Sequence, residues 1–213
     1  MYLSRIEVNP RRRQTMLALS SPQIMHAALE SSFPRPVDDT KRNLWRVDKL
    51  NQSLYVLLQS RQKPDFTHFI EQFGWPAADQ TWETKEYDAF LARLKDGQTW
   101  RFRLRANPVH SVKEKDAPGR GRVLGHITVE QQKQWLSGRA TVNGFNLDNS
   151  AGFDVVQRET KKFTRSGKPV TLSVAAFEGV LLIENAETFV QLLLSGIGRA
   201  KAYGCGLMTL ARL

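Results

Sequence analysis

The order in which strand-like and helix-like segments follow one another constrains the fold of this chain more than any other feature. Alternating apolar and polar residues predict strands, and apolar residues recurring every three or four positions predict helices. In the first half we expect strand 2–8, a helix from residue 21, strands 43–47 and 53–60, and a helix after residue 64. In the second half we expect strand 99–107, helix 128–136, strands 153–159 and 171–184, helix 186–194 and strand 207–211. Each half therefore approximates the order strand–helix–strand–strand–helix–strand.

This order is that of the ferredoxin-like unit. We predict an α+β chain of two tandem ferredoxin-like domains, residues 1–95 and 96–213, each an antiparallel sheet with helices on one face. The closing strand of the first half is not identified, because the two tryptophans of residues 74–87 suit strands and loops alike. RNA-recognition domains use a sheet of this kind as a docking face, so the fold is compatible with RNA binding.

Local signals mark the starts of two of these helices. Ser21 can cap a helix whose first turn holds Pro22, since proline lacks the N–H that would be unpaired there. Thr128, with Gln131 three residues later, forms a potential capping box. The buried stripe predicted for the first helix comprises Met25, Ala28, Leu29 and Phe33.

The chain carries a large positive charge for its length. Its 31 Lys and Arg residues outnumber 21 Asp and Glu residues, which gives a formal net charge of +10. Such a surface favours a polyanion as the partner, with nucleic acid first and an anionic membrane second. Charge alone leaves open the alternative of a basic protein that has no such partner.

Several other classes of protein are disfavoured. No apolar run reaches the roughly 18 residues that predict a membrane-spanning helix. Residues 1–8 resemble a strand rather than a signal peptide, so we expect a cytoplasmic protein with no membrane partner. The single cysteine, Cys205, rules out an internal disulfide and a cysteine-based zinc cluster. Because it lies between two glycines, Cys205 is predicted to be a small packed residue.

Two basic segments are candidates for RNA contacts. In the strand at 99–107 apolar residues alternate with arginines, so Arg103 and Arg105 share the face opposite the core. Residues 158–168 read as a hairpin with its turn at Ser166–Gly167. Its five cations are Arg158, Lys161, Lys162, Arg165 and Lys168. Such a ribbon can enter an RNA groove or follow its phosphates, and a solvated hairpin is the open alternative.

Two glycine-rich segments are expected to be loops. Residues 110–125 are also basic and are predicted to be mobile, and residues 196–206 hold four glycines with Arg199 and Lys201. The second segment is no Walker loop, because no Gly-Lys-Ser/Thr closes it. It is no dinucleotide fingerprint either, because Lys201 stands where the third glycine belongs. Two roles stay open: Gly198 and its neighbours bring backbone N–H groups close to phosphates, or the segment is a tight turn into the last strand.

Histidine is the residue type best suited to proton transfer near neutral pH. None of the four histidines sits in an HExxH or similar metal pattern, and no carboxylate pair has two-metal spacing, so we predict no metal and no cofactor. His26 follows Met25 on the flank of the first helix, with Gln23 three residues earlier. A helix flank is a rigid mount for an acid–base group, although a structural or surface histidine is the alternative. His68, close to Phe69, is predicted to be structural.

Five segments, in the same order along the chain, resemble the CasE family, the repeat-RNA endoribonucleases of the Cascade complex. They are Met1–Arg5, Met25–His26, Phe102–Pro108, Phe177–Leu181 and Gly196–Leu207. The resemblance implies two ferredoxin-like domains and a metal-independent cut at the base of the CRISPR repeat RNA hairpin. It also implies that the mature crRNA is retained beside other Cascade subunits. The nucleophile would be the 2′-hydroxyl of the RNA, whose attack on the adjacent phosphorus leaves a 2′,3′-cyclic phosphate.

The resemblance places the family's active-site histidine at His26 and its RNA-gripping element at residues 158–168. The family often has a tyrosine three residues before the histidine, where this chain has Gln23. A phenol can exchange a proton and an amide cannot, so Gln23 can only orient the phosphate or the attacking hydroxyl. The alternative function is therefore a non-catalytic crRNA-binding subunit with a structural His26. A DNA-binding protein is disfavoured, because no helix-turn-helix or zinc pattern is evident.

Overall fold

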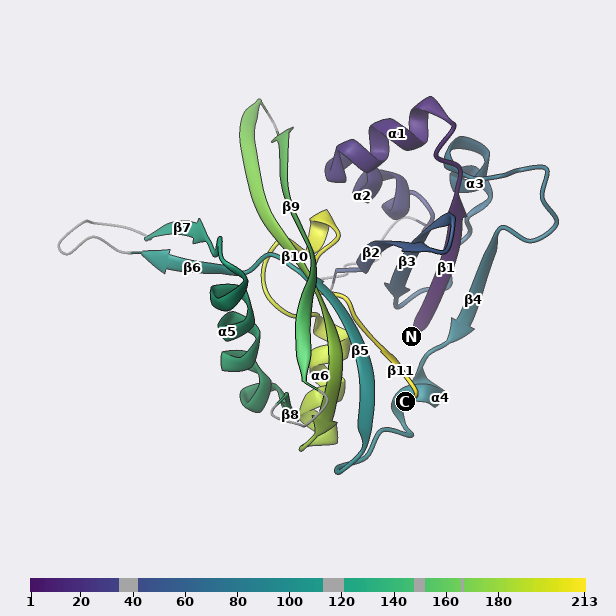
Figure 1. Ribbon diagram of the computed structural model, residues 1–213. Helices are drawn as coiled ribbons and strands as arrows, with labels where there is room; N and C mark the ends of the chain where they lie inside the picture. Colours follow the sequence, from purple (N-terminus) through teal and green to yellow (C-terminus); the bar gives the residue numbers. More distant parts are fainter. Residues whose placement is uncertain (35–41, 113–120, 148–151, 166) are drawn as a thin grey trace.

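The computed structural model describes residues 1–34, 42–112, 121–147, 152–165 and 167–213, and it is built around two antiparallel sheets (Figure 1). The first sheet has the order β2-β3-β1-β4, with strands β1 (Tyr2–Val8), β2 (Leu44–Leu50), β3 (Ser53–Ser60) and β4 (Trp82–Glu86). The second has the order β11-β5-β10-β8, with β9 also paired to β10. Its strands are β5 (Thr99–Ala106), β8 (Phe145–Asn146), β9 (Phe153–Arg165), β10 (Lys168–Ile183) and β11 (Met208–Ala211).

The helices complete two ferredoxin-like units. The first unit contains α1 (Arg13–Ser20), α2 (Pro22–Glu30) and α3 (Thr67–Phe73), and the second contains α5 (Val129–Ala140) and α6 (Ala186–Ser195). The short helix α4 (Asp88–Leu91) lies between them in the chain. In both sheets the last strand of the unit lies beside its first strand, and every neighbouring pair is antiparallel. The predicted fold class is therefore confirmed.

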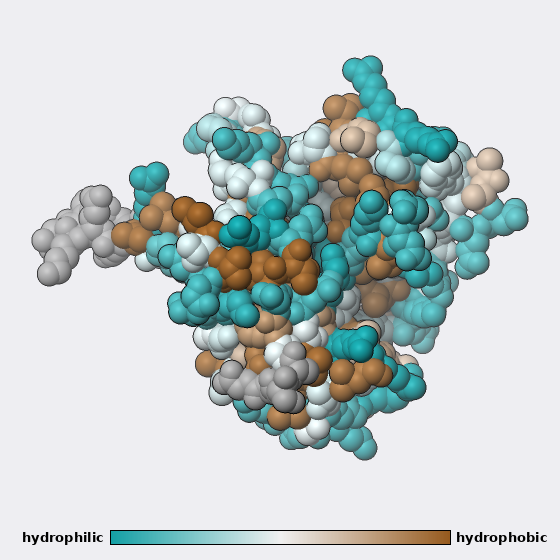
Figure 2. Space-filling view, in the orientation of Figure 1, coloured by the Kyte–Doolittle hydropathy of each residue, from teal (hydrophilic) through white to brown (hydrophobic). Residues whose placement is uncertain are grey.

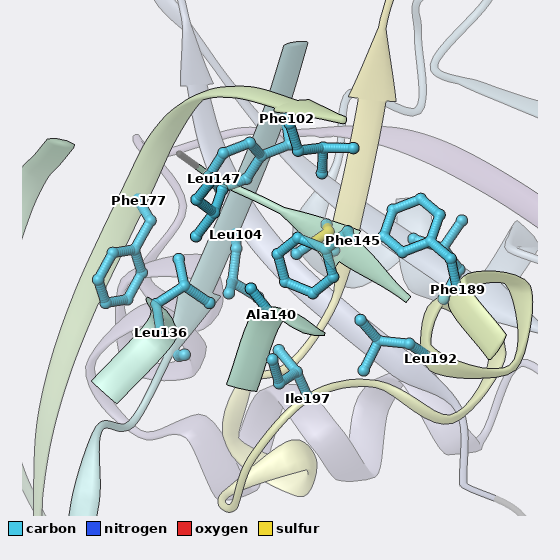
Figure 3. Close-up of a cluster of buried hydrophobic side chains, with 14 of the residues drawn as sticks. Phe102, Leu104, Leu136, Ala140, Phe145, Leu147, Phe177, Phe189, Leu192 and Ile197 are labelled. Atoms are coloured by element: carbon cyan, nitrogen blue, oxygen red, sulfur yellow. The ribbon is translucent and has the colours of Figure 1, made fainter. Parts of the chain in front are cut away.

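Each sheet has its own apolar core. In the first, Met25 and Leu29 of α2 pack with Ile6 of β1 and Phe69 of α3. In the second, side chains of β5, β10, α5 and α6 meet (Figure 3), and those labelled there are Phe102, Leu104, Leu136, Ala140, Phe145, Leu147, Phe177, Phe189, Leu192 and Ile197. Residues just before position 95 also join the second core, namely Tyr87, Leu91 and Leu94. The domain boundary at 95/96 stays a prediction.

Some local predictions hold and others are wrong. Thr128 and Gln131 form the expected capping box, with Thr128 Oγ1 accepting from the Gln131 N–H at 3.2 Å. Ser21 makes no side-chain capping hydrogen bond, so the predicted cap of α2 is wrong. The expected loop at 110–125 is wrong at both ends, because β6 (Val109–Val112) pairs with β7 (Arg122–Gly125). Residues 113–120 between these strands lie outside the described residues, as does the predicted turn residue Ser166.

Strand β2 joins the two units through buried polar contacts. Arg46 is 1% exposed, and its guanidinium donates to the carboxylate of Asp48 in the same strand. The same group reaches across to the second unit, where it donates to the Arg103 carbonyl at 2.8 Å, the Leu207 carbonyl at 3.0 Å and Thr209 Oγ1 at 2.8 Å. Since one buried side chain bonds to β2, β5 and β11 together, the two sheets hold a fixed relative position.

Candidate active site

His26 lies on the flank of α2 that faces away from the core. Met25 and Leu29 of this helix are fully buried, and they fix the rotation of the helix. The His26 side chain is 30% exposed, and its Nδ1 lies 3.7 Å from Glu30 Oε1, one turn later. Gln23, three residues before His26, is exposed at the start of the same helix. The structure therefore mounts His26 rigidly, at a half-buried position that solvent and a ligand can reach.

The surroundings of His26 favour its neutral form. Burial lowers the pKa of His26 below its ordinary value of 6.5, and the positive charges of Arg42 and Arg165 lower it further. The Glu30 carboxylate opposes this shift by raising the pKa, but the net direction is downward. An imidazole held neutral at neutral pH can accept a proton from a substrate hydroxyl.

The basic hairpin formed by β9 and β10 stands beside α1 and α2, with its tip at the height of these helices (Figure 1). Lys161 of β9 donates from Nζ to the Leu19 carbonyl of α1 at 3.1 Å, which ties the hairpin to the first unit. Arg165 ends β9, and its charge acts on His26. Hydrophilic side chains cover most of the face shown in Figure 2, and the apolar ones form separate patches.

Lys162 and Lys168 of the same hairpin are exposed. The structure thus gathers His26 and the distal part of the hairpin from opposite halves of the chain.

The glycine-rich segment 196–206 lies against the helix that carries His26. A short 3₁₀ turn, η2 (Lys201–Tyr203), packs against α2 and β2. The segment is held by backbone hydrogen bonds from Ile197 N to the Gly206 carbonyl at 3.0 Å and from Gly206 N to the Arg105 carbonyl at 2.7 Å. Lys201 donates to the Ser195 carbonyl at 2.7 Å, while Gly198 and Arg199 are exposed.

We expect Gly204→Ala to destabilise the protein through this segment. Gly204 has φ +76°, and a Cβ there would lie 2.8 Å from Cζ3 of the Trp45 ring. Gly97 has a similar φ of +80°, but a Cβ there meets nothing within 4 Å, so Gly97→Ala is a matched control for backbone strain alone. Gly204→Ala should lower the free energy of unfolding by about 1–3 kcal/mol more than Gly97→Ala, which chemical denaturation measures. Equal losses would contradict this packing.

Three predicted RNA contacts lie elsewhere. Arg103 pairs with Asp48 at 3.1 Å and also with Glu178, and Arg105 pairs with Glu159. The side of β5 that carries these arginines is turned toward β2 and β9 rather than toward open solvent. Arg158 donates to the Ile127 carbonyl at 3.0 Å, before α5. The structure does not bring these three side chains to His26, and their RNA contacts stay a prediction.

Arg42 is the site residue that the sequence analysis missed. It precedes β2, and its charge acts on both His26 and Lys201. The basic pair Lys41–Arg42 between a helix and a strand is the one signal in the sequence that marks it. A basic pair is too common on protein surfaces to single out a site by itself.

The remaining histidines and the cysteine have other surroundings. His68 is wrongly predicted as structural, since its side chain is 86% exposed and pairs with Glu71 at 3.2 Å. The rings of His110 and His126 lie 4.7 Å apart, between β6 and the start of α5.

Cys205 is fully buried, which confirms the packing prediction, and burial raises its pKa to about 11. Within the described ranges, no three His, Cys, Asp or Glu side chains are grouped so that they could hold a metal ion.

Comparison with known proteins identifies the family. The chain is 30% identical to the Cascade subunit CasE of Escherichia coli and 29% identical to the CRISPR-associated endoribonuclease Cse3 of Thermus thermophilus. These alignments cover 100% and 99% of this chain, respectively, and 100% of each relative.

Solved structures agree with these sequence matches. Thermus thermophilus Cse3, bound to an RNA that represents a pre-cleavage complex, superimposes with a TM-score of 0.80 at 27% identity and covers 99% of this chain and 98% of its own. Cas6e of Escherichia coli superimposes with a TM-score of 0.70 at 27% identity over 100% of both chains. Among the described residues, no helix has the length and apolar character needed to cross a membrane. The family described as CRISPR associated protein matches residues 1–212, and the chain belongs to this family.

Proposed function

We propose that this protein is a CRISPR-associated endoribonuclease that cuts a repeat RNA hairpin at its base and keeps the product within Cascade. The observation that carries the proposal is a neutral histidine, His26, placed among cations from both halves of the chain. A neutral base can accept the proton of the attacking hydroxyl, and positive charges beside it can stabilise the phosphate in RNA transesterification. Relatives that align over the whole chain include an endoribonuclease and a Cascade subunit, which supports both parts of the proposal.

In this reaction the 2′-hydroxyl oxygen forms a bond to the adjacent phosphorus, and the bond from phosphorus to the 5′-oxygen breaks. The proton of the 2′-hydroxyl passes to His26, and the leaving 5′-oxygen takes up a proton from water. The products are a 2′,3′-cyclic phosphate and a 5′-hydroxyl. Arg42 and Arg165, whose charges reach His26, stabilise the negative charge that builds up on the phosphate oxygens.

Gln23 takes a positioning role in this scheme. Its amide has no proton to exchange at neutral pH, so it can only donate to or accept from the phosphate and the attacking hydroxyl. The proposed chemistry therefore places proton acceptance on His26 alone. The absence of a phenol at position 23 is also the one observation that favours a non-catalytic RNA-binding subunit.

The pH dependence of cleavage follows from the pKa of His26. Below this pKa the imidazole is protonated and cannot accept the hydroxyl proton, so the rate falls on the acid side. Because the pKa of the free protein is lowered, the acid limb of the cleavage rate measured at limiting protein concentration, which reports on the free protein, should have its midpoint below pH 6.5. In Glu30→Gln the carboxylate that raises the pKa is gone, so the midpoint should move to still lower pH. A midpoint above 6.5, or a shift upward in the variant, would contradict His26 as the base.

A single change in the substrate tests the proposed reaction. Replacing the attacking 2′-hydroxyl by hydrogen should abolish cleavage of the hairpin RNA and leave its dissociation constant nearly unchanged. Cleavage that persists in the 2′-deoxy RNA would show that water, rather than the RNA itself, supplies the nucleophile. Tight binding of the unmodified RNA with no cleavage would instead support the non-catalytic subunit.

A further inference from the structure

A pocket of about 570 Å³ lies between the ends of β2 and β3 on one side and the glycine-rich segment on the other. Pockets that hold small ligands commonly range over about 300–1,000 Å³, so its size suits one or two nucleotides of a single strand. Four of its lining side chains are cationic, and none of its described lining residues is acidic. The four cations are Arg42, Arg61, Arg199 and Lys201.

The lack of acidic partners distinguishes these cations from the arginines of β2 and β5. Arg46, Arg103 and Arg105 each pair with a carboxylate. The four pocket cations form no ion pair with an acid of the described residues. Like charges gathered without a counter-charge repel each other, and an anion that enters the pocket relieves that repulsion.

Lys201 shows this local excess of positive charge. Its Nζ is held against the Ser195 carbonyl at 2.7 Å, so the ammonium cannot swing freely into solvent. Burial lowers the pKa of Lys201, and the charge of Arg42 lowers it further. A phosphate bound between these two side chains would raise the pKa of Lys201 again.

Arg42 connects the pocket to the proposed site of cleavage. Its charge acts on His26, and its side chain lines the pocket. A strand whose scissile phosphate lies at His26 can therefore continue past Arg42 into the pocket. For a cut at the 3′ foot of the stem, the nucleotide on the 5′ side of that phosphate is paired, and only the strand on the 3′ side is free to enter.

We propose that this pocket binds the phosphates of the unpaired RNA strand that continues 3′ of the scissile phosphate. The inference rests on the proposed function, since it needs an RNA cut beside His26. It adds a binding site for the part of the substrate that leaves after cleavage. Precursor RNA would then bind more tightly than the processed hairpin, which lacks this strand.

Arg61 offers a test because it lines the pocket from the end of β3, apart from His26 and the basic hairpin. The matched control is Arg11→Ala, whose side chain is exposed in the connection after β1. Tyr2 pairs with Ser60 and Val8 with Leu54. Arg61 and Arg11 thus lie beyond opposite ends of β1, about 20 Å apart at a rise of about 3.3 Å per residue.

The experiment measures the dissociation constants of three hairpin RNAs, all with the attacking 2′-hydroxyl replaced by hydrogen so that none is cut. One RNA ends at the nucleotide 3′ of the scissile phosphate, one has a longer unpaired 3′ extension, and one has a 5′ extension of equal length. Wild type should bind the 3′-extended RNA most tightly. Arg61→Ala should weaken that binding by about fivefold and reduce its salt dependence by about one phosphate contact. Arg11→Ala should match wild type on all three RNAs.

The outcomes separate this inference from the proposed function. Equal affinity of wild type for all three RNAs, or a gain from the 5′ extension alone, would overturn the inference. An equal loss for all three RNAs in Arg61→Ala would also overturn it, because the pocket would then act on the hairpin. Cleavage of the short hairpin with an intact 2′-hydroxyl, measured in parallel, reports on the proposed function independently.

Discussion

His26→Ala should lower the single-turnover rate of hairpin cleavage by about 10²–10⁴-fold, the usual contribution of a positioned proton acceptor. The dissociation constant of the RNA should stay close to that of wild type, because Arg42, Arg165 and Lys161 remain in place. Alanine suits the interior of α2 and removes a side chain that lies on its flank, so the helix should persist. Rapid-quench cleavage and filter binding on the same preparations measure both quantities.

The control for this variant is His68→Ala. His68 lies on the exposed side of α3 and pairs with Glu71 at the surface, so its removal should change neither rate nor affinity. A wild-type rate in His26→Ala would remove His26 from the chemistry. A parallel loss of rate and affinity would make His26 a binding residue rather than a proton acceptor.

Arg46→Ala should lower the free energy of unfolding by about 3–5 kcal/mol, because it breaks a buried charged network that joins the two units. Without the guanidinium, the buried carboxylate of Asp48 keeps Arg103 as its one partner among the residues that the structure describes. The carbonyls of Arg103 and Leu207 lose a donor at the same time. Chemical denaturation measures the loss, and a second transition in the curve would show that the two units then unfold separately.

The comparison for Arg46→Ala is Arg5→Ala on the exposed face of β1. Arg5 pairs with Glu83 at 3.4 Å, and solvent screens this exposed pair, so its removal should leave stability almost unchanged. If both variants lost the same amount of stability, burial would not be the reason for the effect at Arg46.

Local patterns in the sequence predicted much of the fold because they report directly on burial. The alternation in β5 placed Phe102 and Leu104 on the core side, where they are buried. The position of His26 beside Met25 placed it on the flank of α2, where the structure has it. Helix α1 gave no such signal, since it buries only Thr15 and Ala18 and lacks an apolar stripe.

Partners far apart in the chain could not be predicted in this way. The arginine side of β5 resembles a solvent face, yet Arg103 meets Asp48 from 55 positions earlier and Glu178 from 75 positions later. A carboxylate that neutralises an arginine leaves no mark on the sequence around it. Arg42 was missed for the same reason, because its approach to His26 and Lys201 depends on how β2 lies against the second unit.

We propose that this chain cuts RNA with its own side chains and the 2′-hydroxyl of the substrate. Single-turnover cleavage by wild-type protein in excess EDTA, with analysis of the product ends, tests this directly. The substrate is the hairpin repeat RNA from the CRISPR array of the same host. We predict one cut at the base of the stem, a 2′,3′-cyclic phosphate on the upstream product and a 5′-hydroxyl on the downstream one. No cut in EDTA, with cleavage restored by a divalent cation and leaving a 5′-phosphate, would contradict this mechanism.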